Sequence, residues 1–304
     1  MDFNQLFYDL IELDLGEVLE NEPMYKHTTF KVGGPARFFV KISSVEGLKR
    51  GIQYCRGHQL KHMVIGKGSD LLFSDKEYEG VIFSLVDGLN KVHINGSQIK
   101  AEAGVGMIYL AYQAAKTGLS GFEFMSGIPG TIGGGVYMNA GAYKYCMADA
   151  FSSALILDEN CEFRTLSKEE MQFNYRRSIL QLHQDWILVE ATFEMNVKDP
   201  QDIMSVLDKR KEKRMATQPW NFASAGSIFR NCDDKPAWQF IDECGLRGYE
   251  IGGAQVSPKH SNFIVNNGYA SAKDILDLIL LVQKTVFDHC GVELKREVIL
   301  VNWE

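Results

Sequence analysis

The stretch GIPGTIGGGVYMNAGAY, residues 127–143, restricts the fold more than any other part of this sequence. It contains six glycines and Pro129, and it carries no charged side chain. Glycine loses more backbone entropy on folding than any other residue, so a run this dense needs a structural or functional reason. Either two backbones approach closely here, or a ligand lies directly on main-chain N–H groups.

A second glycine-containing loop, Gly66 to Leu71, follows an apolar strand pattern, as phosphate-binding loops do. It is not the Rossmann dinucleotide fingerprint, because Leu71 stands where the third glycine belongs. It is not a Walker A loop either, because Lys67 falls between the two glycines. Either loop alone could be purely structural. Two such loops in one region, both poor in charge, favour a large dinucleotide bound through backbone amides.

Length and composition indicate a globular chain of about two domains. The chain has 304 residues, of which 45% are hydrophobic and 23% charged. Its net charge of −7 argues against non-specific nucleic-acid binding. The acidic N-terminus lacks the basic start of a signal peptide, and the apolar run at 278–282 is too short to span a bilayer. We therefore expect a cytoplasmic protein with no membrane or nucleic-acid partner.

The spacing of cysteines and histidines predicts neither disulfides nor a metal site. Six cysteines are scattered along the chain without a C-x-x-C pair: Cys55, Cys146, Cys161, Cys232, Cys244 and Cys290. His58 and His62 are four residues apart, but Gln59 occupies the glutamate position of H-E-x-x-H. We expect reduced thiols, no bound metal, and a solvent-facing helix around the two histidines.

Hydrophobic periodicity predicts helices and strands mixed along the chain. Helices are expected over the first 25 residues and over 43–58, 107–117, 201–215 and 272–290, the last capped by Ser271 and Asp274 and ended by Gly291. Strands are expected at 26–42 (broken at Gly33), 62–65, 80–88, 91–105, 186–195 and 296–303, with a hairpin turn at Asn95-Gly96. Since these elements follow no regular βαβ rhythm, the predicted class is α+β.

The order of motifs along the chain resembles that of the UDP-N-acetylenolpyruvoylglucosamine reductase family. The segments are TTFKVGGPA, GKGSDLL, GFEFMSGIPGTIGGGVYMNAGAY, FNYRRSI, AGSIFRN, GGAQVSPKHSNFIVN and LKREV. The resemblance covers nearly the whole chain, and the short run from FNYRRSI to AGSIFRN is similar to the type II form of the family. Lys67 and Asp70 stand where the family usually has glycine and asparagine, and Cys232 replaces its usual proline.

The resemblance implies a PCMH-type (vanillyl-alcohol-oxidase-like) FAD-binding domain over 1–205, in subdomains 1–87 and 88–205, and an α+β substrate-binding domain over 206–304. FAD is expected to bind non-covalently, since residues 66–72 contain no histidine or cysteine. The residues that would contact it are Gly66, Lys67, Gly68, Ser69, Asp70, Leu71, Gly127, Ile128, Pro129, Gly130, Gly133, Gly134 and Gly141.

The activity that the resemblance implies is reduction of an enolpyruvyl ether by NADPH through FAD, in bacterial cell-wall precursor synthesis, by a monomer. Arg176 would hold the substrate carboxylate and stabilise its enolate form. A guanidinium suits this role because it is always charged and presents paired hydrogen-bond donors. Glu297 would donate a hydrogen bond to the same enolate, which requires a protonated carboxyl group. Ser227 would supply the proton to the carbanion-like carbon. From the residues alone, Arg176 reads as a surface cation and Glu297 as a solvated strand residue.

The small residues before Ser227 (Ala223, Ala225 and Gly226) are explained if a flavin and a substrate both approach that hydroxyl. Further substrate contacts are expected from Asn231, Arg230, Tyr175, His260 and Asn262. For His260 and Asn262, a structural hydrogen bond is an equally good explanation. Two other functions stay open: a different PCMH-type flavoprotein oxidase, and a non-catalytic nucleotide-sugar binding module.

Overall fold

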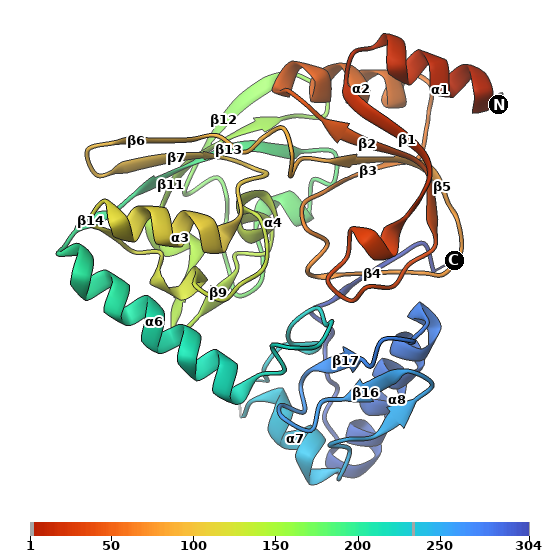
Figure 1. The fold of residues 1–304 in the computed structure, drawn as a ribbon, viewed down its shortest axis with the longest axis vertical. Helices are drawn as coiled ribbons and strands as arrows, with labels where there is room; N and C mark the ends of the chain where they lie inside the picture. Colours follow the sequence, from red (N-terminus) through yellow and green to blue (C-terminus); the bar gives the residue numbers. More distant parts are fainter. Residues whose placement is uncertain (1–2, 233–234, 304) are drawn as a thin grey trace. The chain divides into compact units, whose positions relative to one another are not determined.

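The structure, a computed structural model, describes residues 3–232 and 235–303. Helices and strands are mixed along the chain (Figure 1), which confirms the predicted α+β class. The chain divides into two compact units. Unit 1 takes the described residues of 1–21, 37–67 and 79–212, and unit 2 those of 22–36, 68–78 and 213–304.

The first sheet, most of which belongs to unit 1, has the strand order β1-β2-β5-β3. Its strands and neighbouring helices are α1 (Phe3–Glu12), β1 (Gly16–Pro23), β2 (Pro35–Ile42), α2 (Val45–Gly57), β3 (His62–Ile65) and β5 (Tyr78–Ser84). Leu10 of α1 and Ile52 of α2 are fully buried in one core cluster with Phe38 and Phe83 of the sheet. The apolar faces of both helices thus cover this sheet.

Two element predictions near the N-terminus are wrong. The helical pattern does not run through residue 25, because Gly16 adopts a φ of +131° against the carbonyl of Lys41, and strand β1 begins there. The strand expected from residue 26 begins only at Pro35. Before it lie η1 (Met24–Lys26) and an irregular loop in which Lys31 and Gly33 have positive φ, which no strand accommodates.

The second sheet of unit 1 is antiparallel, with the order β12-β11-β13-β7-β6. Its strands and covering helices are β6 (Val92–Asn95), β7 (Gln98–Glu102), α3 (Met107–Lys116), α4 (Ile132–Tyr137), α5 (Met147–Ala150), β11 (Phe151–Leu157), β12 (Phe163–Ser167) and β13 (Ile187–Glu194). The predicted hairpin between β6 and β7 is present. Its turn lies one residue later than predicted, since Asn95 pairs with Gln98.

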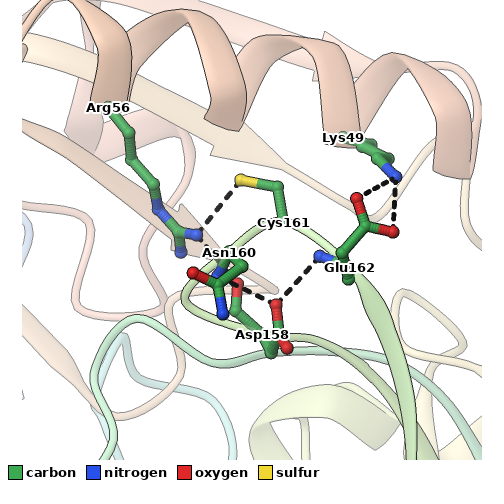
Figure 2. Close-up of polar contacts among 6 residues, drawn as sticks. All are labelled: Lys49, Arg56, Asp158, Asn160, Cys161 and Glu162. Atoms are coloured by element: carbon green, nitrogen blue, oxygen red, sulfur yellow. Dashed lines mark hydrogen bonds and ion pairs between the residues drawn. The ribbon is translucent and has the colours of Figure 1, made fainter.

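The turn between β11 and β12 is held against helix α2 (Figure 2). Arg56 of α2 donates to the carbonyl of Asp158 at 2.8 Å and to the thiol sulfur of Cys161 at 3.1 Å. Nearby, Lys49 forms an ion pair with Glu162 at 3.3 Å. These contacts join the helix of the first sheet to the second sheet within unit 1.

Unit 2 contains a three-stranded antiparallel sheet, ordered β15-β16-β17, and a parallel pair, β4-β18. Its elements are β4 (Leu71–Phe73), α7 (Ala237–Glu243), β15 (Glu250–Ile251), β16 (Ala254–Val256), β17 (Ile264–Asn266), α8 (Ala272–Cys290) and β18 (Ile299–Val301). Helix α8 has the predicted Ser271–Asp274 capping box and ends at Gly291, whose φ is +68°. Residues 68–78 belong to unit 2 because β4 pairs with β18.

Helix α6 (Pro200–Thr217) is continuous, and unit 2 begins within it, at Lys213. The boundary expected after residue 205 therefore falls inside a helix. The remaining short elements are β8 (Leu119–Ser120), η2 (Glu123–Met125), β9 (Gly141–Ala142), β10 (Tyr145–Cys146), η3 (Ile179–Gln181) and β14 (Asn196–Val197). Among the residues described, none of the helices combines the length and apolar character needed to cross a membrane.

Candidate functional site

The start of the first glycine loop lies directly against the second glycine stretch in unit 1. A Cβ atom on Gly66 would stand 2.3 Å from Oγ1 of Thr131, so only glycine allows this approach. The same Thr131 is buried, pairs with Gly106 in an isolated bridge, and caps helix α4 by accepting from the N–H of Gly134. The structure thus brings together two segments that the sequence places 65 residues apart, from Gly66 to Thr131.

At the beginning of the second stretch, main-chain donors have no backbone acceptor among the described residues. Gly127 and Gly130 are buried, and within the described residues their N–H groups donate no backbone hydrogen bond. Ser126 is 2% exposed, and its hydroxyl has no hydrogen-bond partner among the residues that the structure describes. Buried polar groups are normally satisfied, so unused donors in series indicate a missing acceptor. This donor set fits the phosphates and polar groups of a dinucleotide such as FAD.

Other predicted cofactor residues of unit 1 have structural contacts of their own. Gly133 donates to the carbonyl of Ala103 at 2.8 Å, and Ile128 donates to that of Met125 at 3.0 Å. Pro129 is exposed, and Lys67 extends its ammonium group against Gly106, the N-cap residue of α3. A Cβ on Gly141 would lie 2.6 Å from the carbonyl oxygen of Tyr145, so the β9-β10 hairpin itself requires glycine there.

The rest of the first loop belongs to unit 2. Gly68 has a φ of +57°, and a Cβ there would lie 2.3 Å from the carbonyl oxygen of His27. Ser69 and Asp70 form the following turn, and the carbonyl of Asp70 accepts from Ile299 at 2.9 Å. Leu71 then starts β4. Backbone contacts within unit 2 therefore set the conformation of residues 68–71.

Ser227 and Glu297, two of the predicted catalytic residues, lie on paired backbone segments of unit 2. The N–H of Glu297 donates to the carbonyl of Ile228 at 2.8 Å, and Arg230 donates to Lys295 at 2.9 Å. Phe229 forms a bridge with Arg296 between these two bonds. Ser227 and Glu297 are both half-buried. The segment AGSIFRN and the terminal LKREV, about 70 residues apart, thus form one local structure.

Asn262 holds this segment in place. Its Nδ2 donates to the carbonyl of Phe229 at 2.9 Å, its Oδ1 accepts from the N–H of Phe229 at 3.0 Å, and its own carbonyl accepts from Ile228 at 2.8 Å. Asn262 is 3% exposed. Its amide is engaged on both sides, which favours the structural explanation that the sequence left open.

The remaining predicted substrate residues of unit 2 are Arg230 and Asn231, at the end of the same segment, and His260. The Oδ1 of Asn231 accepts from the N–H of Ala237 at 3.2 Å, at the start of α7. Nε of Arg230 and Nδ1 of His260 are buried and have no hydrogen-bond partner in the described chain. Burial, and secondarily the charge of Arg247, lowers the pKa of His260, so the neutral imidazole is favoured. Arg230 and His260 both keep hydrogen-bonding capacity for a ligand.

Arg176, the third predicted catalytic residue, lies in unit 1 in a tight turn with Tyr175. Its Nη2 donates to the carbonyl of Gly141 at 3.0 Å, and its guanidinium lies 4.9 Å from the centre of the Tyr175 ring. Tyr175 itself is about half exposed. The guanidinium is therefore hydrogen-bonded to the end of the glycine-rich stretch, whereas an ordinary surface cation would extend into solvent.

Two residues that the sequence did not single out support this turn: Asn139 and Gln181. Asn139 stands within the glycine-rich stretch, and its Nδ2 donates to the carbonyl of Asn174 at 2.9 Å. Gln181 donates to the carbonyl of Arg176 at 3.1 Å. No motif marks Gln181, because its role depends on a turn geometry that only the structure reveals.

Across residues 3–232 and 235–303, no three His, Cys, Asp or Glu side chains are arranged to hold a metal ion. The two histidines spaced four residues apart lie on different elements. His58 caps the end of α2, and His62 begins β3 with its Nδ1 against the carbonyl of Leu60. The single helix face expected for them is therefore wrong.

Comparison with known proteins identifies the class and the family of the chain. Residues 36–167 match the family model of an FAD binding domain, which defines the class as a flavoprotein. Residues 218–301 match the C-terminal domain of UDP-N-acetylenolpyruvoylglucosamine reductase.

Similar proteins over the full length carry the same name. The chain is 43% identical to UDP-N-acetylenolpyruvoylglucosamine reductase 1 of Bacillus anthracis, over 98% of this chain and 99% of that protein. It is 45% identical to the reductase of Anoxybacillus flavithermus over 97% of each chain. The crystal structure of the reductase from Thermus caldophilus has a TM-score of 0.79 at 31% identity, covering 93% of this chain and 98% of that one. The chain belongs to the UDP-N-acetylenolpyruvoylglucosamine reductase family.

Proposed function

We propose that this chain, an FAD-dependent oxidoreductase of that family, reduces the enolpyruvyl group of UDP-N-acetylglucosamine enolpyruvate with NADPH. The product would be UDP-N-acetylmuramate, a peptidoglycan precursor. The observation that carries the proposal is the backbone pairing of residues 228–230 with 295–297, which brings the Ser227 and Glu297 segments together. Family membership favours this function over another PCMH-type oxidase or a binding module without catalysis.

The cofactor, bound non-covalently, would be held by the unused donors at Ser126, Gly127 and Gly130. When bound, FAD supplies the hydride chemistry between NADPH and the methylene carbon of the substrate. The residues 66–71 would contribute the close approach of backbone that Gly66 and Gly68 permit. Lys67 would add a positive charge near the pyrophosphate.

Side chains of the protein would stabilise the negative charge that develops on the substrate and would supply the proton. Arg176 would stabilise the negative charge that develops on the substrate carboxylate, because a guanidinium stays protonated throughout. Glu297 would donate a hydrogen bond to the same group. Ser227 would deliver a proton to the carbon next to the carboxylate, as a general acid. Asn231 and Arg230 would bind the diphosphate, and Tyr175 and His260 would each add a further contact to the substrate.

The test is the visible spectrum of the purified protein under anaerobic conditions. We expect a bound yellow flavin that NADPH bleaches and that the enolpyruvyl sugar nucleotide restores. Restoration by oxygen alone, with no response to the sugar nucleotide, would favour an oxidase instead. A colourless protein that binds the sugar nucleotide would favour the binding module. The monomeric state and the cytoplasmic location belong to this proposal, and sedimentation of the purified protein tests the first.

The Asn231→Ala variant tests where the substrate binds. We expect a raised KM for the sugar nucleotide with flavin reduction by NADPH nearly unchanged, because the lost contact is to the diphosphate. Asn231 also caps the first turn of α7 through Ala237, so Asn231→Asp, which keeps the cap but adds a negative charge, is the matched control. Loss of FAD from Asn231→Ala would mean that this residue serves the flavin or the fold.

A further inference from the structure

The turn that carries Arg176 has an unfavourable backbone conformation. Asn174 and Arg177 exchange both of their main-chain hydrogen bonds, at 3.0 and 3.1 Å, so Tyr175 and Arg176 are the two central residues of a tight turn. Arg176 has a φ of +54°, in the left-handed region where a side chain is strained. Glycine or asparagine is usual at such a position. An arginine there requires support from its surroundings.

Two amide side chains supply that support. The Nε2 of Gln181 donates to the carbonyl of Arg176 at 3.1 Å and to the carbonyl of Tyr137, at the end of α4, also at 3.1 Å. The buried Asn139 donates to the carbonyl of Asn174 at 2.9 Å. Both donors thus attach the turn to the stretch 127–143.

We propose that Gln181 is a positioning residue for the reaction: it holds the main chain of Arg176 in the left-handed conformation and so aims the guanidinium. The inference rests on the proposed role of Arg176. Without the Gln181 amide, the carbonyl of Arg176 loses this hydrogen bond and the residue can relax toward negative φ. The guanidinium would then leave the carbonyl of Gly141 and the ring of Tyr175.

The second hydrogen bond of Gln181, to the carbonyl of Tyr137, does not complicate the interpretation of a Gln181 variant. The carbonyl of Tyr137 also accepts from the hydroxyl of Ser178 at 2.7 Å, so it stays satisfied when the Gln181 amide is removed. Gln181 ends the short helix η3, and it is half-buried rather than part of the apolar core. Truncating it should therefore leave the fold intact and act mainly on the turn.

The experiment measures the two half-reactions of the FAD-loaded Gln181→Ala variant by stopped-flow absorbance. We expect reoxidation by the enolpyruvyl sugar nucleotide to slow by roughly 10- to 100-fold, since misplacing a catalytic group by about 1 Å has that effect. Reduction by NADPH and FAD content should stay normal. Gln172→Ala is the matched control, because Gln172 lies in the same segment, has a φ of +47° and is exposed. Its half-reactions should both be normal.

A double-mutant cycle with Arg176→Ala separates positioning from a general structural effect. If Gln181 acts through Arg176, adding Gln181→Ala to Arg176→Ala should slow reoxidation no further. Additive slowing, or normal reoxidation in Gln181→Ala, would overturn the proposal. If Arg176→Ala alone reoxidises normally, the proposed role of Arg176 fails instead.

A second variant and a second readout cover the case in which Gln181→Ala does not fold. Gln181→Met keeps the size of the side chain but cannot donate, and it should show the same selective slowing. In its flavin-free form, amide hydrogen exchange should be faster across residues 174–177 and unchanged in strand β13. Exchange that is unchanged at 174–177 would contradict the proposal without any measurement of activity.

Discussion

The main-chain N–H of Glu297 donates a hydrogen bond of 2.8 Å to the carbonyl of Ile228, the residue next to Ser227. Through this contact the C-terminal segment fixes the position of a serine about 70 residues earlier in the chain. Asn262 holds the same segment from the other side, at Phe229. The proton donor proposed here therefore sits on a backbone that three separate segments of unit 2 define.

The flavin should be released completely by acid. Neither histidine nor cysteine occurs at residues 66–72, so we expect no covalent bond to FAD in this loop. After precipitation of the holoenzyme with acid, all of the absorbance at visible wavelengths should appear in the supernatant. Colour that stays with the precipitated protein would contradict a non-covalent cofactor.

Substituting Gly66 should damage the flavin site through Thr131. The Cβ of Gly66→Ala would lie 2.3 Å from Thr131 Oγ1, and the short, buried threonine has little room to move. We expect a loss of about 1–3 kcal/mol in the free energy of unfolding, as for other overpacked sites, together with weaker FAD binding. Denaturant titration and flavin content measure the two effects.

Two further variants make the Gly66 prediction specific. Thr131→Ala in the Gly66→Ala background removes the clashing atoms and should recover part of the lost stability. Gly57→Ala, where no described atom outside its chain neighbours and the backbone of α2 lies within 4 Å of the new Cβ, should be neutral or stabilising. Equal damage from both glycine substitutions would mean that the contact with Thr131 does not matter.

The strain at Arg176 should be visible in stability. Arg176→Gly and Arg176→Ala both remove the guanidinium, but only glycine adopts a φ of +54° without a steric cost. We therefore expect the glycine variant to be more stable than the alanine variant by about 1–2 kcal/mol, with both slow in flavin reoxidation. Equal stabilities in urea titrations would show that the turn relaxes freely.

The acid dependence of stability should include a contribution from the cap of α8. Hydrogen bonds from Ser271 to the carboxylate, first from its main-chain N–H and then from its side chain, hold the pKa of Asp274 below its ordinary value of 3.8. A carboxyl group with a depressed pKa stabilises the fold above 3.8, and this contribution is lost as the pH falls through the folded-state pKa. Asp274→Asn should therefore cost about 0.5–1 kcal/mol at neutral pH, with the difference from wild type shrinking in acid.

Urea titrations at several pH values measure the effect of Asp274→Asn. The matched control is Asp277→Asn on the same helix, whose carboxylate forms a surface ion pair with the exposed Lys273 at 2.6 Å. Such surface pairs contribute little, so the control should differ from wild type by less than about 0.5 kcal/mol. A difference for Asp274→Asn that persists at low pH would show that its charge is not the cause.

The sequence predicted the elements whose signals are local. The capping box of Ser271 and Asp274 and the stop at Gly291 define α8 as expected, because both depend on neighbouring residues alone. The pattern of apolar and acidic residues over 1–25 predicted too long a helix. The chain leaves the helical conformation because Gly16 packs against the carbonyl oxygen of Lys41. The helical periodicity of a sequence carries no information about such a contact between distant residues.

The types of residue in the candidate site could be predicted from the sequence, but the residues that hold their backbone in place could not. The glycines at 66 and 127–135 and the hydroxyl of Ser227 stood out because their surroundings are unusual in composition. Gln181 carries no such signal, and Asn262 read equally well as a ligand contact. Their contacts arise from main-chain carbonyls and N–H groups at Arg176 and Phe229, which only a folded chain brings into reach.

The most direct test of the account is stopped-flow absorbance of both half-reactions in Ser227→Ala. Reduction of the flavin by NADPH needs no proton from Ser227, so it should proceed at nearly the wild-type rate. Reoxidation by the enolpyruvyl sugar nucleotide should slow by roughly 10²–10⁴-fold, the usual cost of losing a general acid. Ser227→Cys, with a more acidic group of similar size, should keep part of the activity. Normal reoxidation in Ser227→Ala would remove this residue from the mechanism, and equal slowing of both steps would show that it serves the structure instead.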